Sequence, residues 1–353
     1  MKAGSASASE SIRVLVLESR DKIVLGSPSG LMNGGHGKTK KLTVTPDEAA
    51  SGPVRVQATD GIVRVNGKPY RGVIEIRRSG KGSLLAVNEL DLEEYLRGVI
   101  SGEMPPDWES EALKAQAVVA RTFALYQKRE SGRRPYHLVA TVNGQVYAGA
   151  RDERPETDRA VRETAGVVLT YGGRIVPAFF HSSCGGRTED ASELWGLDEP
   201  YLKGVDCDCQ RISKYGEWEK RIDREVVERS LHARGYRIGT ITLAKTGSIT
   251  RAGRVREVEL FNGTTGTFIP AEELRQAVGY DQVPSLFFEV ELDGRELVFS
   301  GRGRGHGVGL CQWGSRWMAQ QGKGYREILR YYFPGTDLVR IHTRTAVDAD
   351  DRR

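Results

Sequence analysis

The stretch EEYLRGVISGEMPPDWESEALKAQAVVARTFAL, residues 93–125, predicts two helices that meet at a stiff corner. Gly102 is a natural terminator for the first helix, and Pro105 and Pro106 cannot continue it. A residue that precedes a proline is driven toward extended geometry, so the chain should leave the helix along a fixed path. Glu103 is therefore expected at a rigid exit, where its carboxylate is held in place at little entropic cost.

Further residues mark the start of the first helix and the buried face of the second. Asp91 is a good N-cap for the first helix, and Glu94 stands at the capping-box position. The second helix is expected at about residues 110–128. One of its faces consists of apolar and mostly small residues, namely Leu113, Ala117, Ala120 and Ala124. Small side chains let a helix approach its neighbours closely, so we expect this helix to be buried.

Short alternations of apolar and polar residues before the helices predict a β-rich region. Residues 11–26 should form two strands, and residues 52–90 a meander. The expected turns of this meander are at Asp60-Gly61, Asn66-Gly67 and Gly80. Its expected core residues are Val54, Val56, Ile62, Val63, Val65, Ile74 and Ile76.

These patterns together predict an α+β fold with two domains. A β-rich core domain, which contains the buried helix pair and its corner, should comprise residues 11–219 and 284–342. Residues 220–283 alternate helical and hairpin patterns and predict a smaller α/β peripheral domain inserted into the core. The polar ends, residues 1–10 and 343–353, are expected to be flexible.

The composition argues against several classes of protein. With 52 Lys and Arg against 47 Asp and Glu, the net charge is +5, and the basic residues form no dense block, so nucleic acid is not an expected partner. No apolar run reaches the roughly 18 residues that a membrane span needs. Residues 1–18 lack the apolar core of a signal peptide, so we expect any export signal or anchor to be absent from this sequence. The GRGRGHGVG run lacks the ending of a phosphate loop, and no organic cofactor is expected.

The four cysteines stand in glycine-rich or turn-like segments, at positions 184, 207, 209 and 311. If Cys184, Cys207, Cys209 and Cys311 converge, their thiolates would form a closed, structural zinc site. A competing interpretation is that disulfides link Cys184 and Cys311 to the Cys207/Cys209 pair, as in an exported protein. The third interpretation is four unrelated buried thiols. We favour zinc among these interpretations.

Two histidines are candidates for lining a cleft. His181 ends an apolar strand and is followed by Ser182, and His306 stands between two glycines that would allow a ligand to approach closely. Trp195 and Trp313 could stack on sugar rings, although tryptophans in such segments are as often part of the core.

The corner glutamate also has a simpler interpretation. By its position alone, Glu103 is typical of a solvated acid in a loop.

The motifs in this order resemble the stage II sporulation protein D family, also called SpoIID/LytB. The resemblance spans about residues 85–340 and rests on LDLEEYLRGVISGEMPPDWESEALKAQAVVARTFAL, FFHSSCGGRTEDASELWG, YLKGVDCDC and GRGRGHGVGLCQWGSRWMAQQGKGYREILRYYFPGTDL. It implies a bacterial cell-wall protein outside the cytoplasmic membrane. It further implies a lytic transglycosylase that cleaves peptidoglycan glycan strands, preferably strands stripped of stem peptides. Members of the family can carry zinc, and some relatives are described as amidase enhancers.

The resemblance also assigns a chemical role to the corner, since the essential glutamate of the family maps to Glu103. A glycoside hydrolase usually needs two carboxylates, whereas a lytic transglycosylase needs one, because the C6 hydroxyl of muramic acid is the nucleophile. Arg121 is expected to hold the lactyl carboxylate of the sugar or to pair with Glu103. The other expected sugar contacts are Gln145, Tyr147, His181, Ser182 and His306.

Two other functions stay open from the sequence. The chain could be a non-catalytic module that binds glycan and enhances a cell-wall amidase. It could also be a metal-dependent hydrolase that uses the cysteine site, but four thiolate ligands leave no open coordination position for a substrate.

Overall fold

The computed structural model describes residues 10–33, 36–141 and 144–341. Its contacts divide the chain into a first unit, Met1–Ala178 with Asp337–Arg353, and a second unit, Phe179–Thr336. The structure contains both helices and β-sheets, which confirms the mixed composition of the predicted α+β fold. The ends that were expected to be flexible lie outside the described residues, except residue 10. Glu10 is held in place, because its backbone oxygen accepts a hydrogen bond from Leu92 N–H and its carboxylate pairs with Lys128.

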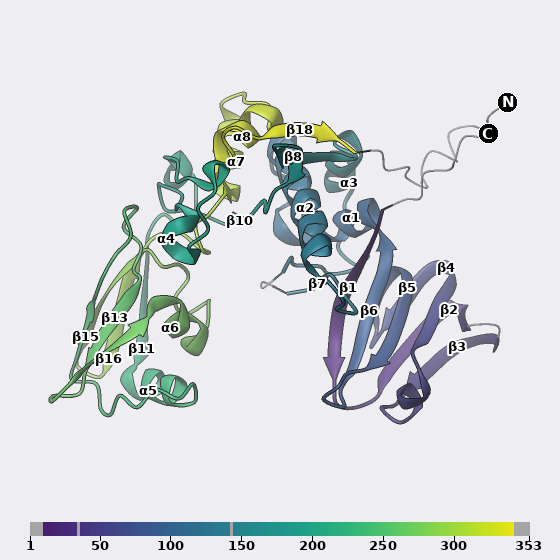
Figure 1. The fold of residues 1–353 in the computed structure, drawn as a ribbon, viewed down its shortest axis with the longest axis horizontal. Helices are drawn as coiled ribbons and strands as arrows, with labels where there is room; N and C mark the ends of the chain where they lie inside the picture. The colour runs from purple at the N-terminus through teal and green to yellow at the C-terminus, as the bar shows by residue number, and fades with distance from the viewer. Residues whose placement is uncertain (1–9, 34–35, 142–143, 342–353) are drawn as a thin grey trace. The chain divides into compact units, whose positions relative to one another are not determined.

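The first unit contains a seven-stranded sheet with the strand order β3-β2-β4-β5-β6-β1-β7 (Figure 1). Neighbouring strands are antiparallel, except that β1 and β7 are parallel. The strands are β1 (Ser11–Ser19), β2 (Ile23–Asn33), β3 (His36–Val44), β4 (Val54–Val65), β5 (Lys68–Arg78), β6 (Leu84–Asp91) and β7 (Leu138–Val139), with a short 3-10 helix η1 (Glu48–Ser51) between β3 and β4.

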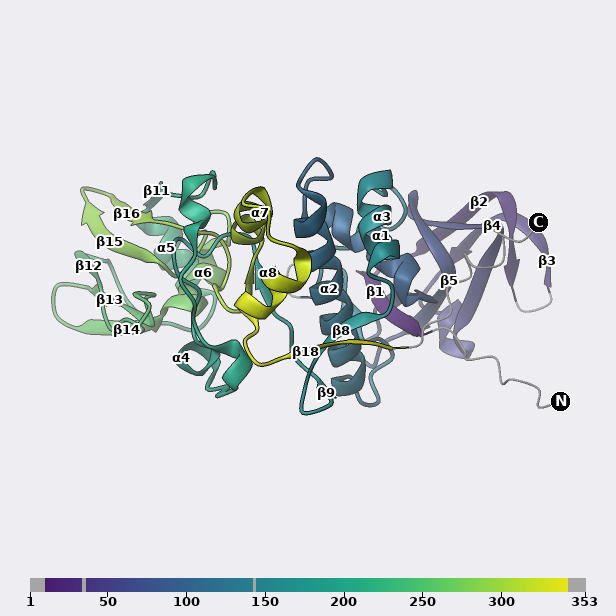
Figure 2. The same cartoon turned by 90° about the horizontal axis from the view of Figure 1, so that it is seen from above.

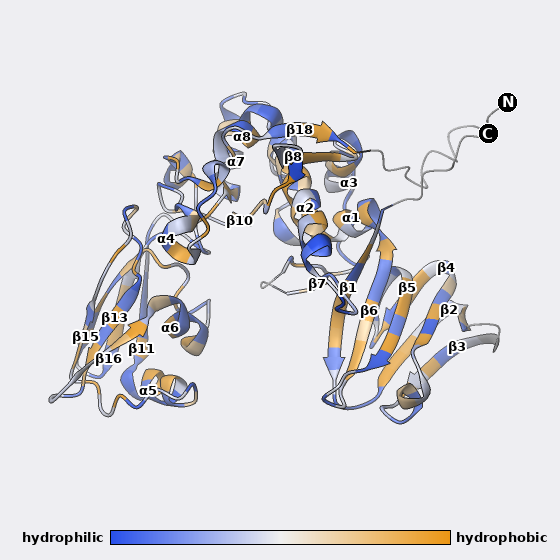
Figure 3. Ribbon diagram, viewed as in Figure 1, coloured by the Kyte–Doolittle hydropathy of each residue, from blue (hydrophilic) through white to orange (hydrophobic). Residues whose placement is uncertain are grey.

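The predicted meander corresponds to β4, β5 and β6. Figure 3 shows the alternation of hydrophobic and hydrophilic residues along β4, which gives the sheet one apolar face. Five of the seven expected core residues are buried, and Val54 and Ile62 are half-buried. The turn at Asn66-Gly67 is confirmed, since both residues have positive φ angles, of 46° and 86°. The turn expected at Asp60-Gly61 is wrong, because these residues form an irregularity inside β4.

The remaining elements of the first unit are the helices α1 (Leu92–Glu103), α2 (Ser110–Glu130) and α3 (Pro155–Glu163) and the strands β8 (Val167–Tyr171), β9 (Arg174–Ile175) and β18 (Asp337–Arg340). Figures 1 and 2 show the three helices side by side, and each contacts the other two. Asp91 caps α1 as predicted, because its carboxylate accepts hydrogen bonds from the backbone N–H groups of Glu93 and Glu94. Helix α2 buries most of its residues, as the small-residue face predicted.

The second unit is built from short elements around three small sheets, ordered β10-β17, β11-β16-β15 and β12-β13-β14. Its strands are β10 (Phe180–His181), β11 (Trp218–Asp223), β12 (Leu243–Thr246), β13 (Glu257–Phe261), β14 (Gly266–Pro270), β15 (Phe288–Asp293), β16 (Glu296–Gly301) and β17 (Leu310–Cys311). Its helices are α4 (Ala191–Trp195), α5 (Arg224–His232), α6 (Ala271–Val278), α7 (Gln312–Gln320) and α8 (Tyr325–Tyr332), with 3-10 turns η2 (Pro200–Leu202) and η3 (Asp208–Arg211).

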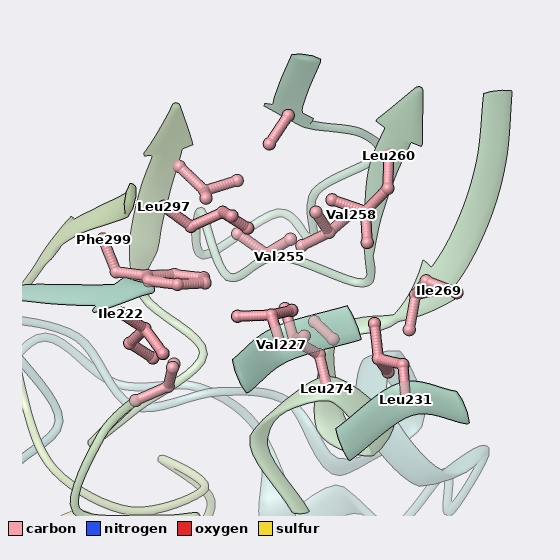
Figure 4. Close-up of a cluster of buried hydrophobic side chains, with 14 of the residues drawn as sticks. Ile222, Val227, Leu231, Val255, Val258, Leu260, Ile269, Leu274, Leu297 and Phe299 are labelled. Carbon is pink, nitrogen blue, oxygen red and sulfur yellow. The ribbon is translucent and has the colours of Figure 1, made fainter. Parts of the chain in front are cut away.

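One hydrophobic core in this unit joins α5 and α6 to the strands. In Figure 4, Val227 of α5 and Leu274 of α6 lie across from Val258 of β13. The same cluster includes Phe299 of β16, and β16 pairs along its length with β11. The packing thus extends the α/β part to residue 301, beyond the end at residue 283 that the sequence predicted. The reason is that β15 and β16 contribute buried apolar residues to the same cluster, among them Phe288, Leu297 and Phe299, and a short apolar strand does not reveal from sequence which core it joins.

No helix within the described ranges is both long enough and apolar enough to cross a membrane.

Candidate functional site

The predicted corner exists, and Glu103 is the last residue of α1. The helix thus ends one residue later than expected, since Gly102 is still helical. Met104 follows with φ −133° and ψ 142°, which is the extended geometry predicted for a residue before Pro105. Glu103 is half-buried, so the residue is neither enclosed in the interior nor fully exposed to solvent.

Residues 144–149 form a segment that supports this carboxylate. The backbone N–H of Val146 donates a hydrogen bond of 2.8 Å to Oε1 of Glu103. The segment approaches α1 closely because Gly98 and Gly102 face it one helical turn apart. A Cβ atom on Gly98 would lie 2.5 Å from the carbonyl oxygen of Gly149, and one on Gly102 would lie 3.1 Å from that of Val146. The spacing of these glycines in the sequence was a signal of close packing that the terminator interpretation missed.

Gln145 and Tyr147, which were expected to contact sugar, lie inside the first unit. The Gln145 amide accepts a hydrogen bond from the Tyr95 hydroxyl at 3.0 Å and donates one to the Ala120 carbonyl at 3.1 Å. The Tyr147 hydroxyl donates to Asn88 Oδ1 at 2.9 Å. Both side chains are buried, so their polar atoms bind protein groups instead of reaching solvent. They fix the segment that carries Val146, and their expected role is corrected to positioning.

Tyr95 links this support to the electrostatics of the corner. Burial raises the pKa of the Tyr95 phenol well above its usual value, and the negative charge of Glu103 raises it further. Tyr95 therefore stays neutral, and its hydroxyl keeps donating a hydrogen bond to Gln145. Its ring also lies 4.9 Å from that of Tyr147, which adds packing beneath the segment.

Arg121 is fully buried, and its predicted role is corrected. Its guanidinium forms two hydrogen bonds of 2.7 Å with the carboxylate of Glu93, instead of pairing with Glu103. It also donates to the backbone carbonyls of Val161 and Val167. All of these partners belong to the protein interior, so Arg121 holds α1, α2, α3 and β8 together and cannot reach the lactyl group of a sugar.

The four cysteines converge in the second unit. Their Sγ atoms all lie within 4.8 Å of one another, and those of Cys184 and Cys209 are 3.4 Å apart. All four are buried free thiols, so no disulfide links them and they are not unrelated. Four thiolates around one zinc ion at about 2.3 Å have sulfurs about 3.8 Å apart, which fits this cluster. The donor set could hold one tetrahedral, soft-ligand metal ion with no position open to a substrate.

Neighbouring groups donate hydrogen bonds to these sulfurs. The backbone N–H groups of Cys184 and Gly314 each donate to Sγ of Cys311 at 3.3 Å, and the Tyr332 hydroxyl lies 3.2 Å from Sγ of Cys207. Burial raises the pKa values of the Cys184 and Cys311 thiols, whereas hydrogen bonds from the other three cysteines lower the pKa of Cys209. A cation among the four sulfurs would supply the positive charge that ionisation of all four requires.

His181 and His306 belong to the second unit too, close to the cysteines. The pairing of β10 with β17 places His181 opposite Cys311, and the two imidazole rings are 5.4 Å apart. Nδ1 of His306 accepts from Val308 N–H at 3.0 Å, so Nε2 carries the proton and donates to the Phe180 carbonyl at 2.9 Å. Burial lowers the pKa of His306 to about 4, which keeps the ring neutral at pH 7.

His181 is more buried than a sugar contact should be. Its Nδ1 lies 3.1 Å from the Val308 carbonyl, and its Nε2 has no hydrogen-bond partner among the residues that the structure describes. Burial lowers its pKa well below the usual value. Ser182 is half-buried, and its role stays a prediction. Trp195 is 46% exposed and lies 5.1 Å from the ring of His306, so this tryptophan is not part of the core.

Comparison with known proteins places these residues in a family. The family model described as SpoIID, stage II sporulation protein, matches residues 80–171, a stretch that contains Glu103 and ends before the first cysteine. Over 72% of its length the chain is 31% identical to stage II sporulation protein D of Bacillus subtilis, and it covers 76% of that protein. This chain therefore belongs to the stage II sporulation protein D family.

Two further relatives define how far the similarity extends. The chain is 35% identical to an uncharacterized protein of Brachyspira hyodysenteriae, over 73% of this chain and 69% of that protein. It is 28% identical to the amidase enhancer of Bacillus subtilis over 80% of its own length. Only 46% of the amidase enhancer is covered, so more than half of that relative has no counterpart in the alignment.

Proposed function

We propose that this chain is a lytic transglycosylase that cleaves the glycan strands of bacterial peptidoglycan, preferably strands without stem peptides. The single observation that carries the proposal is the carboxylate of Glu103, which is half-buried at the end of α1 and oriented by the Val146 N–H at 2.8 Å. Membership in the stage II sporulation protein D family supports a role in the cell wall. The protein would then act outside the cytoplasmic membrane.

The chemistry needs only this one acid. Protonated Glu103 donates its proton to the glycosidic oxygen as the bond from that oxygen to C1 of muramic acid breaks. The C6 hydroxyl of the same sugar then attacks C1, and its proton returns to the Glu103 carboxylate. The atoms balance without water, so one product ends in a 1,6-anhydro ring and the enzyme recovers its starting state.

Zinc bound by Cys184, Cys207, Cys209 and Cys311 belongs to the same proposal as a structural ion. Four buried thiols within 4.8 Å of one another support it. When bound, such an ion crosslinks the loops that carry its ligands and supplies folding energy, because all its positions are occupied by protein. The chemical step at Glu103 would not involve it.

The test is incubation of the protein with glycan strands stripped of peptide, followed by mass spectrometry. We expect fragments with anhydro ends, each lighter by one water than a hydrolysis product. Glu103→Gln should reduce the rate about 100-fold or more, as loss of a general acid does. Glu111→Gln is the matched control, because Glu111 is a carboxylate in the first turn of α2 that pairs with Lys114. Equal rates for Glu103→Gln and the parent protein would refute the mechanism.

A second candidate function is favoured by one relative, the amidase enhancer. In that case the chain would bind glycan without cleaving it and would stimulate a cell-wall amidase. The same incubation separates the two functions. Binding without fragments, together with more amidase product when both proteins are mixed, would favour the enhancer.

A further inference from the structure

The second unit contains a cleft of 410 Å³, and Cys207 is the one predicted site residue among those that line it. We call it the α7 cleft, and it lies among η3, α7 and α8, with Trp317, Tyr331, Asp206, Asp208, Gln210 and Gln321 among its lining residues. Sites for small molecules typically measure roughly 300–1,000 Å³. The α7 cleft is therefore large enough for a small ligand, and it is open to solvent.

Two aromatic rings of the α7 cleft are held in place although neither is fully buried. Trp317 is half-buried, and the guanidinium of Arg211 lies over its ring at 5.7 Å. Tyr331 is 42% exposed, and its hydroxyl donates to the Asp206 carbonyl at 2.7 Å. Anchored aromatic faces that remain accessible suit a ligand with a flat apolar face. The ring of a hexose presents such a face through its axial hydrogens.

The charges around the α7 cleft favour a neutral ligand. Its three charged lining residues each have an oppositely charged partner: Asp206 pairs with Arg187 at 2.5 Å, Asp208 with Arg211 at 2.9 Å, and Lys323 with Glu327 at 3.1 Å. An ionic ligand such as a peptide terminus would have to compete with these pairs. Hydroxyl and acetamido groups would only need hydrogen bonds, which paired carboxylates and the exposed amides of Gln210 and Gln321 can provide.

We propose that the α7 cleft is a saccharide-binding site that takes a neutral N-acetylhexosamine unit of a glycan strand. This rests on the proposed function for the kind of polymer that the chain meets, but the site is separate from Glu103 in its residues. It stacks one sugar on Trp317 and Tyr331 and bonds its hydroxyls to Asp208 and the two glutamines. Its task is to hold the strand, and no bond is broken there.

The four-cysteine cluster explains why the α7 cleft is preformed. Cys207 and Tyr332 line it, and the Tyr332 hydroxyl lies 3.2 Å from the Cys207 sulfur. Gly314 of α7 also lines it, and a Cβ atom there would collide with both groups. The buried side of the cleft is therefore fixed by the same loops that converge on the cysteines, which reduces the ordering that a bound sugar must impose.

The experiment titrates the Glu103→Gln protein with tri-N-acetylchitotriose while NMR follows the backbone amide and indole N–H signals, so that binding is also measurable in variants that lack an indole. Glu103→Gln is used so that the probe is not cleaved. We expect the Trp317 indole to shift with an affinity on the order of millimolar. Trp317→Ala should weaken this binding at least tenfold, and Gln321→Ala, which alters only an exposed side chain, should weaken it a few-fold. Gln320→Ala is the matched control for Gln321→Ala, since Gln320 is the exposed last residue of α7 and does not line the cleft.

Each outcome decides the proposal. Signal shifts confined to residues outside the α7 cleft would overturn it. So would an affinity for the trisaccharide that is the same in the Glu103→Gln protein and in its Trp317→Ala and Gln321→Ala variants. Trialanine, a zwitterionic peptide, is the competing probe, and its binding at Trp317 without binding of the trisaccharide would also overturn it. The transglycosylase proposal fails separately, if Glu103→Gln still cleaves glycan, and that result leaves the saccharide site standing.

Discussion

Glu93 and Arg121 form a two-bond ion pair inside the first unit, with both nitrogen–oxygen distances 2.7 Å. Glu93 also accepts the backbone N–H of Gly166, and Arg121 also donates to the Val161 and Val167 carbonyls. The pair therefore ties α1 and α2 to α3 and β8. Because α1 ends at Glu103, an ion pair on its first turn fixes the helix that presents the catalytic candidate.

Arg121→Leu should strongly destabilise the first unit. The substitution leaves the Glu93 carboxylate buried without its cation, which typically costs about 3–5 kcal/mol. Urea unfolding monitored by circular dichroism would measure the loss. The double variant Glu93→Leu/Arg121→Leu should recover most of it, because no uncompensated charge remains. A loss below about 1 kcal/mol for Arg121→Leu would mean that the pair is dispensable.

Gly98→Ala should reduce both stability and activity. Alanine is favoured over glycine inside a helix by about 0.5–1 kcal/mol, so helix propensity alone predicts a more stable protein. The added Cβ would, however, lie 2.5 Å from the Gly149 carbonyl oxygen, and the segment that carries Val146 must move. We expect a net loss of about 1–3 kcal/mol and slower glycan cleavage, measured by urea unfolding and product yield.

Gly102→Ala is the internal comparison for this prediction. Its Cβ would lie 3.1 Å from the Val146 carbonyl oxygen, a contact that a small shift relieves. The effect should be clearly smaller than that of Gly98→Ala. If Gly98→Ala unfolds at a higher urea concentration than the parent protein, close packing of the segment against α1 is not what the glycine provides.

The corner was predictable because its causes are local. Proline geometry forces Met104 to be extended, and Asp91 caps α1 through its immediate neighbours, so neither needs information from the rest of the chain. The strand alternation and the Asn66-Gly67 turn are local in the same sense. The cysteines left three interpretations open, and the zinc and disulfide interpretations both bring them together, because which thiols meet is decided by the fold.

The roles of buried polar residues were not predictable from spacing. Arg121 was expected to hold a sugar carboxylate or to pair with Glu103, but its partner is Glu93, which stands 28 positions away on another helix. Gln145 and Tyr147 are polar residues in a loop-like run, which is typical of exposed contacts as well as of buried hydrogen bonds. Only their hydrogen-bond partners show that these side chains are buried and not exposed contacts. The partners are Tyr95, Ala120 and Asn88, and the fold brings them close to residues 145 and 147.

Removal of metal should destabilise the second unit if zinc occupies the four-cysteine cluster. We expect one zinc ion per chain by elemental analysis, and a lower melting temperature after treatment with a strong chelator, because the ligands must otherwise stay buried as thiols. Added zinc should restore the melting temperature. Cys311→Ser should show reduced zinc content. If the protein binds no zinc and its melting temperature is unchanged by the chelator, the proposal of a structural zinc ion is wrong.

His137 should make the first unit less stable as the pH falls from about 6.5 to about 4. Burial, together with the positive charges of Lys128 and Arg13, lowers its pKa from 6.5 to about 4, although the charges of Glu10 and Glu89 oppose the shift. In this window the unfolded chain binds a proton that the folded chain does not, so stability is present above pH 6.5 and is lost on acidification.

The structure supplies a variant that isolates this effect. Nδ1 of His137 accepts a hydrogen bond of 3.1 Å from the backbone N–H of Arg13, and the amide oxygen of asparagine can accept the same bond without titrating. Since His137 is half-exposed, solvent screening reduces the expected loss to about 1–2 kcal/mol between pH 7 and pH 4.5. Urea midpoints across this range should fall less steeply for His137→Asn than for the parent protein. Equal slopes would show that other groups cause the acid sensitivity, because only the imidazole has been removed.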